Sequence, residues 1–135
     1  MIIIDNDSFG SKKIILPNFS LEELMCKCGD CKITFLHESL LLSLVRLRTE
    51  WNNKIQITSA FRCQTHNKKV GGHPHSFHCK GGAVDIVLPV EEEKQKMFKK
   101  LCEKYFDFVL LYLDKGFVHC DNNEKIKKES NFLIS

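Results

Sequence analysis

Two histidines and an aspartate have the residue types and settings expected of zinc ligands. His78 lies in a polar loop, Asp85 lies seven residues later in the apolar run 83–88, and His119 lies in a second apolar run, 117–121. A catalytic zinc ion commonly has three such ligands, with water in the fourth position. A carboxylate between apolar neighbours is costly unless it is paired or binds a metal. From spacing alone, a zinc site and separate structural roles for these residues both stay open.

The apolar patterning predicts the elements that must position these residues. Helical spacing, with a capping box formed by Ser20 and Glu23, predicts a short helix after Ser20 and long helices at 37–51 and 91–105. Alternating patterns predict strands at 55–59 and 83–88, and a hairpin of 108–113 with 117–121 around the turn 114–116. The expected fold class is α+β, a single domain over 1–135 whose helices pack on one side of a small, mostly antiparallel sheet. Its core is expected at about 17–121 and a polar C-terminal tail at about 122–135.

Three segments, in this order along the chain, resemble motifs of the zinc D-Ala-D-Ala peptidase family. Residues 57–72 are similar to its Ser-Gly-Tyr-Arg…Asn…Val-Gly-Gly segment, and 76–86 resemble its signature Ser-x-His-x-x-Gly-x-Ala-x-Asp. Residues 117–121, Phe-Val-His-Cys-Asp, resemble the Phe-Val-His-x-Asp ending of one branch. Residues 19–23 also resemble the opening of that branch, so the similarity covers about 17–121. Three ordered motifs are a specific signal, whereas each alone is weak.

The resemblance implies that His78, Asp85 and His119 bind Zn²⁺ and that Arg62 polarises the scissile carbonyl. A guanidinium near the metal can hold the oxyanion that forms during attack. The implied function is that of a zinc metallopeptidase that hydrolyses peptide bonds in peptidoglycan stem peptides, foremost as a D-Ala-D-Ala carboxypeptidase. A phage endolysin-type L-alanyl-D-glutamate endopeptidase is the alternative. The signalling domain of hedgehog proteins has a similar zinc site, which keeps open a catalytically weak, zinc-containing binding module.

The resemblance leaves the general base undecided. Many family members have Glu or Asp three residues before the last zinc histidine, where this chain has Gly116. Asp121 is expected on the same strand face as His119 and is favoured as an active-site acid, with orientation of His119 as the alternative. Asp114 is the second candidate, with turn formation as its alternative. Tyr112 is expected to face His119 across the hairpin if the loop register allows it.

A cysteine-rich turn raises the question of a second metal. The chain has seven cysteines, an odd number, so they cannot all form disulfides within it. Cys26, Cys28 and Cys31 can supply three corners of a structural zinc site, but His37 is the only fourth ligand that the sequence suggests. A metal site, plain thiols in a turn and a zinc-finger-like adaptor all stay open. Because the turn lies outside the catalytic motifs, we expect Cys28→Ser to lower stability but not activity.

Composition and charge argue against several classes of partner. The formal net charge is only +3 and no basic stripe is evident, which argues against nucleic acid. The longest apolar runs are far shorter than the ~20 residues that span a bilayer, so membrane insertion is not expected. The first residues lack the basic region of a secretory signal. We therefore expect a monomer, synthesised in the cytoplasm without a signal peptide, that acts on the bacterial cell wall in the periplasm or after phage-type release.

Overall fold

The structure, a computed structural model, describes residues 1–9 and 13–124. The elements in chain order are β1 (Ile2–Asp5), α1 (Asn6–Phe9), β2 (Ile14–Leu16), β3 (Phe19–Ser20), α2 (Leu21–Leu24), β4 (Ile33–Leu36), α3 (Glu38–Trp51), β5 (Ile57–Ser59), α4 (Gln64–Lys69), β6 (Ala83–Val87), α5 (Glu92–Tyr105), β7 (Phe108–Tyr112) and β8 (Phe117–Asp121). The expected α+β class is confirmed. Within the described ranges, no helix combines the length and apolar character needed to cross a membrane. Residues 125–135 of the predicted tail lie outside these ranges.

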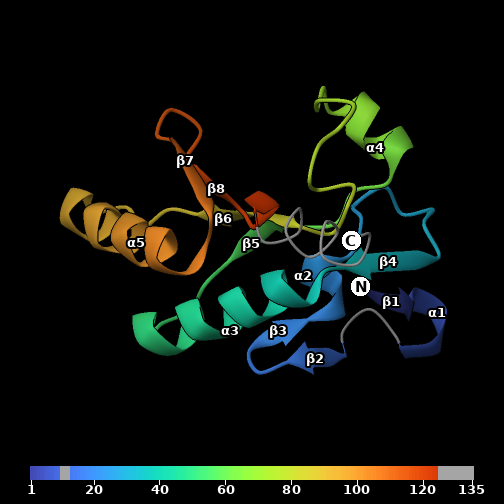
Figure 1. The fold of residues 1–135 in the computed structure, drawn as a ribbon, viewed down its shortest axis with the longest axis horizontal. Coiled ribbons are helices and arrows are strands. Elements are labelled where there is room, and N and C mark those ends of the chain that lie inside the picture. Colours follow the sequence, from blue (N-terminus) through green and yellow to red (C-terminus); the bar gives the residue numbers. More distant parts are fainter. Residues whose placement is uncertain (10–12, 125–135) are drawn as a thin grey trace, which may run out of the picture.

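The central sheet has four strands in the order β5-β6-β8-β7, and every neighbouring pair is antiparallel. The predicted hairpin is confirmed, since β7 and β8 pair from Phe108↔Asp121 to Tyr112↔Phe117. On its other side, β8 pairs with β6, and this register places Asp85 directly opposite His119. Figure 1 shows α3 on one side of this sheet and the short α4 on the other.

The two faces of the sheet differ because side chains alternate along a strand. Val84 and Ile86 of β6, with Val118 and Cys120 of β8, are fully buried and belong to the hydrophobic core. Helices α3 and α5 pack against each other beside that face and contribute the leucines Leu40, Leu44 and Leu47 and the aromatic Phe98. The intervening residues of both strands, among them Asp85 and His119, therefore point to the opposite face.

The predicted helices form where the capping residues place them. The Ser20 N–H donates to the Glu23 carboxylate at 2.8 Å, which completes the predicted capping box at the start of α2. His37 caps α3, since its Nδ1 accepts the N–H of Ser39 at 3.2 Å. Helix α3 ends where Asn52 adopts a left-handed conformation with φ of 51°.

Several short elements are not predicted by the sequence patterns. Strand β1 pairs with β4, and β2 pairs with β3, in two separate two-stranded sheets. Each of these strands has two to four residues, too few for an alternating pattern to stand out. Helix α4 lies within the polar stretch that follows β5 and has no apolar stripe to reveal it. Figure 1 shows the β1–β4 pair beside the loops that follow β5, at the end of the molecule away from α5.

Candidate active site

Strands β6 and β8 bring Asp85 and His119 together on the face of the sheet opposite the core. Directly paired residues of antiparallel strands have Cβ atoms about 4.5–5.5 Å apart and point to the same side. The side chains meet, with His119 Nδ1 3.0 Å from Asp85 Oδ1. The Asp85 side chain is 13% exposed and that of His119 is 19% exposed, so this pair keeps some access to solvent.

His78 reaches the same place from the loop before β6, because the chain turns sharply at Gly81. Gly81 has φ of 74°, and a Cβ there would lie 2.4 Å from the carbonyl oxygen of Phe35. The backbone carbonyl of Gly81 accepts the His37 N–H at 2.8 Å, which holds the loop against the start of α3. This close approach is open only to glycine. The loop therefore returns His78 to β6, where its Nε2 lies 3.3 Å from Asp85 Oδ1.

The ligand atoms of His78, Asp85 and His119, here called the histidine–aspartate group, all lie within 4.8 Å of one another. His78 Nδ1 donates to the carbonyl oxygen of Ala60 at 2.7 Å, so its Nε2 carries the lone pair. That Nε2 is buried, has no hydrogen-bond partner among the described residues, and faces a carboxylate oxygen. Two electron-pair donors face each other favourably only with a cation between them. The donor set therefore fits a metal ion.

Asp121 contacts the far side of the His119 ring. Its Oδ2 lies 2.9 Å from His119 Nε2, and its Oδ1 accepts the backbone N–H of Asn123 at 3.1 Å. An Nε2–H donated to Asp121 leaves the lone pair of His119 on Nδ1, the atom beside Asp85. A carboxylate that holds the second nitrogen of a histidine in this way is common around protein-bound metals.

The charges of this site are strongly coupled. Burial raises the pKa of Asp85, but the adjacent imidazoles of His119 and His78 outweigh burial and lower that pKa to about 2. Burial lowers the pKa of His119, but hydrogen bonds to Asp121 and Asp85 raise it to about 9. Without a metal, His119 is thus an imidazolium between two carboxylates at neutral pH. A bound dication would replace that proton and balance the charge of the carboxylates.

Arg62 lies next to the histidine–aspartate group in the backbone, since its N–H donates to the carbonyl oxygen of His78 at 3.2 Å. The Arg62 guanidinium lies against Gly72. A Cβ added to Gly72 would lie 3.1 Å from a terminal nitrogen of Arg62 and 2.0 Å from Asn67 Oδ1. Glycine at position 72 thus leaves room for both side chains. The Arg62 Nε is buried and has no hydrogen-bond partner among the residues described.

Two other residues named from the sequence lie elsewhere. Asp114 is exposed in the turn between β7 and β8, outside the histidine–aspartate group. The expectation that Tyr112 faces His119 is wrong, because the register pairs His119 with Leu110. Tyr112 pairs with Phe117 instead, and their rings stack at 4.7 Å.

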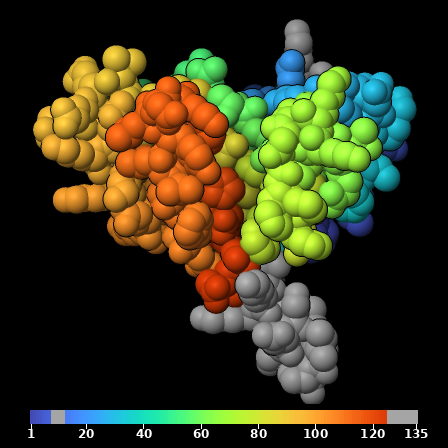
Figure 2. All heavy atoms as spheres, turned by 90° about the horizontal axis from the view of Figure 1, so that it is seen from above, coloured from blue at the N-terminus to red at the C-terminus, as the bar shows by residue number. Residues whose placement is uncertain are grey.

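The face around this site is framed by two segments that are distant in sequence. Figure 2 shows the region of α4 on one side and the β7–β8 hairpin on the other, with the end of β8 between them. The Phe108 ring of β7 lies 6.2 Å from the His119 ring. Sequence reasoning missed Phe108, and it missed Ala60 because a backbone acceptor leaves no residue-type signal.

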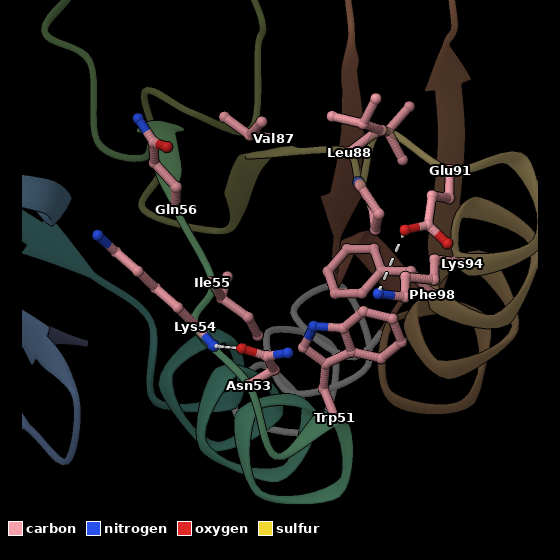
Figure 3. A pocket seen from close by; sticks show the side chains of 12 residues that line it. Trp51, Asn53, Lys54, Ile55, Gln56, Val87, Leu88, Glu91, Lys94 and Phe98 are labelled. Carbon is pink, nitrogen blue, oxygen red and sulfur yellow. Dashed lines mark hydrogen bonds and ion pairs between the residues drawn. The ribbon is translucent and has the colours of Figure 1, made fainter.

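A separate pocket of about 400 Å³ lies between the end of α3, the segment just before β5, the end of β6 and the start of α5. Figure 3 shows its aromatic floor of Trp51 and Phe98, whose ring centroids are 4.9 Å apart, and the ion pair of Glu91 with Lys94 at its edge. None of His78, Asp85 and His119 lines it. This pocket is therefore separate from the histidine–aspartate group.

Comparison with known families agrees with this geometry. The family model described as Peptidase M15 matches residues 17–121 of the chain. The match includes both strands and the loop that form the histidine–aspartate group, and it ends at Asp121. Neither the curated proteins nor the solved structures include a match to this chain.

Proposed function

The chain belongs to the peptidase M15 family, and on this premise we propose that it is a zinc-dependent peptidase that cleaves peptidoglycan stem peptides at the bacterial cell wall. Family membership makes it a metallopeptidase and therefore a hydrolase. The single observation that carries the finer proposal is the convergence of His78, Asp85 and His119, whose ligand atoms lie within 4.8 Å of one another. The buried lone pair of His78 Nε2 supports a cation at their centre.

His78 Nε2, Asp85 Oδ1 and His119 Nδ1 are the atoms that would hold the zinc ion. Zinc bound there supplies a Lewis acid that polarises a peptide carbonyl and activates water. The remaining chemistry belongs to the chain. His78 is kept in the required tautomer by Ala60, and Asp85 carries the negative charge that balances the dication. His119 is the most exposed of the three, so substrate can approach from its side.

The geometry supports a positioning role for Asp121 over that of general base. It is 5% exposed, and each of its oxygens already accepts a hydrogen bond, one from His119 and one from Asn123. A general base must reach the water whose proton it takes, directly or through one further water. Asp121 instead selects the His119 tautomer whose free nitrogen faces Asp85.

Arg62 suits the binding of a carbonyl oxygen that gains negative charge. Its backbone is tied to His78, and its buried Nε–H has no acceptor in the described part of the chain. The Arg62 side chain as a whole is half-buried, and a guanidinium offers several charged N–H donors to a carbonyl oxygen. A hydrogen bond from the guanidinium would strengthen as that oxygen becomes an oxyanion.

Within this proposal, removal of the terminal residue of D-Ala-D-Ala is the first candidate reaction, with L-alanyl-D-glutamate endopeptidase action as the alternative. One observation keeps a binding module in view. Many family members have an acid at the position of Gly116. Gly116 has φ of 75° in the hairpin turn, a backbone conformation that glycine adopts without steric cost. The catalytic acid of those relatives therefore has no direct counterpart in this chain.

The test is to incubate the zinc-loaded protein with purified peptidoglycan and, separately, with a peptide that ends in D-Ala-D-Ala, and to identify products by mass. Release of D-alanine from the peptide supports the carboxypeptidase. Cleavage only within the stem, between L-alanine and D-glutamate, supports the endopeptidase. If a protein with full zinc occupancy cleaves neither substrate, the enzyme proposal fails and a zinc-containing binding module takes its place.

A further inference from the structure

Four cysteines form a second group of metal-binding side chains, here called the cysteine group. Cys26, Cys28 and Cys31 belong to the turn after α2, and Cys63 lies between β5 and α4. Their Sγ atoms all lie within 4.8 Å of one another, and none of the four forms a disulfide. Residues 26 and 63 are far apart in the sequence, so only folding assembles this group.

We propose that the cysteine group binds a second zinc ion in a closed, structural site. This proposal concerns a different site from the proposed peptidase centre and does not depend on it. Zinc bound tetrahedrally to sulfur at about 2.3 Å requires sulfur atoms about 3.8 Å apart. The Sγ–Sγ distances are 3.2 Å for Cys28–Cys31, 3.7 Å for Cys26–Cys63 and 4.0 Å for Cys28–Cys63. These values lie on both sides of the required distance.

Backbone N–H groups point at three of the four sulfur atoms. Asp30 N–H donates to Cys28 Sγ, Cys63 N–H donates to Cys26 Sγ, and His66 N–H donates to Cys63 Sγ, each at 3.4 Å. Hydrogen bonds to ligand atoms orient them and stabilise their negative charge, and such outer contacts are typical of metal sites.

The turn that carries three of the ligands is shaped by Gly29. It has φ of 82°, a conformation that glycine adopts without cost, and it lies between Cys28 and Cys31. The chain can therefore reverse between these two cysteines and present both sulfur atoms to the same point. His37, the fourth ligand suggested by the sequence, caps α3 through its Nδ1. Cys63 takes that place.

A complete set of four thiolates leaves no position for water, which is the arrangement of structural zinc sites. Cys26 is buried in the hydrophobic core, and the other three are half-buried at its edge. Because Cys63 directly follows Arg62, zinc would join the turn after α2 to the segment that carries Arg62. One backbone hydrogen bond, from Phe61 to Leu24 at 3.1 Å, already connects these segments.

Zinc content in a protein whose histidine–aspartate group is disabled tests this proposal. We expect two zinc ions per chain in the wild type and one in His119→Ala, measured by mass spectrometry of the metal after dialysis. Adding Cys63→Ser to His119→Ala should remove the remaining ion. Adding Cys79→Ser instead, which removes a half-buried cysteine outside both groups, should leave it bound. Retention of the ion by the Cys63→Ser double variant would overturn the proposal.

A second measurement covers the case in which Cys63→Ser prevents folding, because it uses only the His119→Ala protein. Cobalt exchanged into that protein should show the intense thiolate-to-cobalt charge-transfer absorption of a tetrahedral sulfur site. Titration with a mercurial thiol reagent should release one metal ion as four thiols react. Absence of both zinc and cobalt binding by the folded, reduced protein contradicts the proposal. So does an intact mass that shows disulfides within the cysteine group after purification in reductant.

Discussion

The histidine–aspartate group takes its ligand atoms from a loop and two adjacent strands, whereas the cysteine group takes them from two loops at the edge of the core. Ligand atoms lie within 4.8 Å of one another in both. In the first group, polar partners hold both rings, Ala60 for His78 and Asp121 for His119. In the second group, backbone N–H groups point at the sulfur atoms.

In our two proposals, this difference separates a catalytic metal site from a structural one. Three ligands with a partly exposed histidine leave a coordination position that substrate and water can reach. Four thiolates fill every position and offer no reactive opening. The proximity of ligand atoms thus indicates metal binding in both groups, but only the number of ligands and their exposure indicate catalysis. Each of the following predictions tests whether the two groups have these separate roles.

The largest effect is expected from His119→Ala. Removal of one of three ligands should abolish zinc binding at the histidine–aspartate group and eliminate peptide cleavage, while the zinc of the cysteine group stays bound. Metal content and product analysis by mass measure the two outcomes. His75→Ala, which removes an exposed histidine outside both groups, is the control and should retain both metal and activity. Full zinc occupancy of both groups in His119→Ala would show that the ligand assignment is wrong.

Cys28→Ser should act on stability. Loss of a metal ligand is among the few single changes that lower the free energy of unfolding by more than about 4 kcal/mol. Below its melting temperature the variant should still cleave substrate, because the contact of Phe61 with Leu24 continues to hold the Arg62 segment. Thermal unfolding and turnover of the folded fraction measure these effects. Turnover lost in a variant that is fully folded would contradict a purely structural role.

Arg62→Ala should slow cleavage without release of zinc from either group. The loss of one donor to a developing oxyanion typically lowers kcat by about 10²–10³-fold. Steady-state kinetics and metal content, determined on the same sample, check both parts. Arg62→Lys is the informative partner, because it keeps the charge and removes the planar guanidinium. Loss of zinc in Arg62→Ala would indicate a structural role instead.

Alanine at Gly81 should cost more stability than alanine at Gly29, the corresponding turn glycine of the cysteine group. Both have positive φ, which costs a residue with a Cβ about 1–2 kcal/mol. At Gly29 nothing lies within 4 Å of the added Cβ, so that cost stands alone. At Gly81 the Cβ would meet Phe35 backbone, and the loop that carries His78 must move. Chemical denaturation measures the difference, and equal costs would contradict the predicted clash.

The smallest effect is expected from Asp121→Asn. If Asp121 positions His119, zinc affinity should fall by about 10–100-fold while turnover at saturating zinc changes little. If Asp121 is the general base, turnover should fall by roughly 10²–10⁴-fold at full zinc occupancy. A zinc titration of activity distinguishes these outcomes. Asp114→Asn, at the exposed turn, tests the other candidate and should change neither quantity.

The local patterns of the chain predicted its longest elements, and its resemblance to a known family predicted the residues of its first site. Helices α3 and α5 and the β7–β8 hairpin follow from apolar periodicity, because each pattern repeats over enough residues to be distinctive. The predicted ligands His78, Asp85 and His119 come together because two of them lie in strands whose neighbours pack in the core. Residue type and spacing left separate roles for these side chains open, and the resemblance of three ordered motifs to the zinc peptidase family was needed to predict that they share a site.

Tertiary structure alone decided the remaining features, because they depend on contacts between distant residues. Register placed Leu110, not Tyr112, opposite His119. The contact of Asp121 with His119 Nε2 gave a physical basis to one of two roles that spacing left open. The Sγ atom of Cys63 lies close to those of cysteines more than thirty residues earlier in the chain. The residues that flank Cys63 in the sequence do not indicate that it is a ligand. A pattern in the sequence predicts which face of a helix or strand a residue occupies. The fold determines which other residues lie beside it.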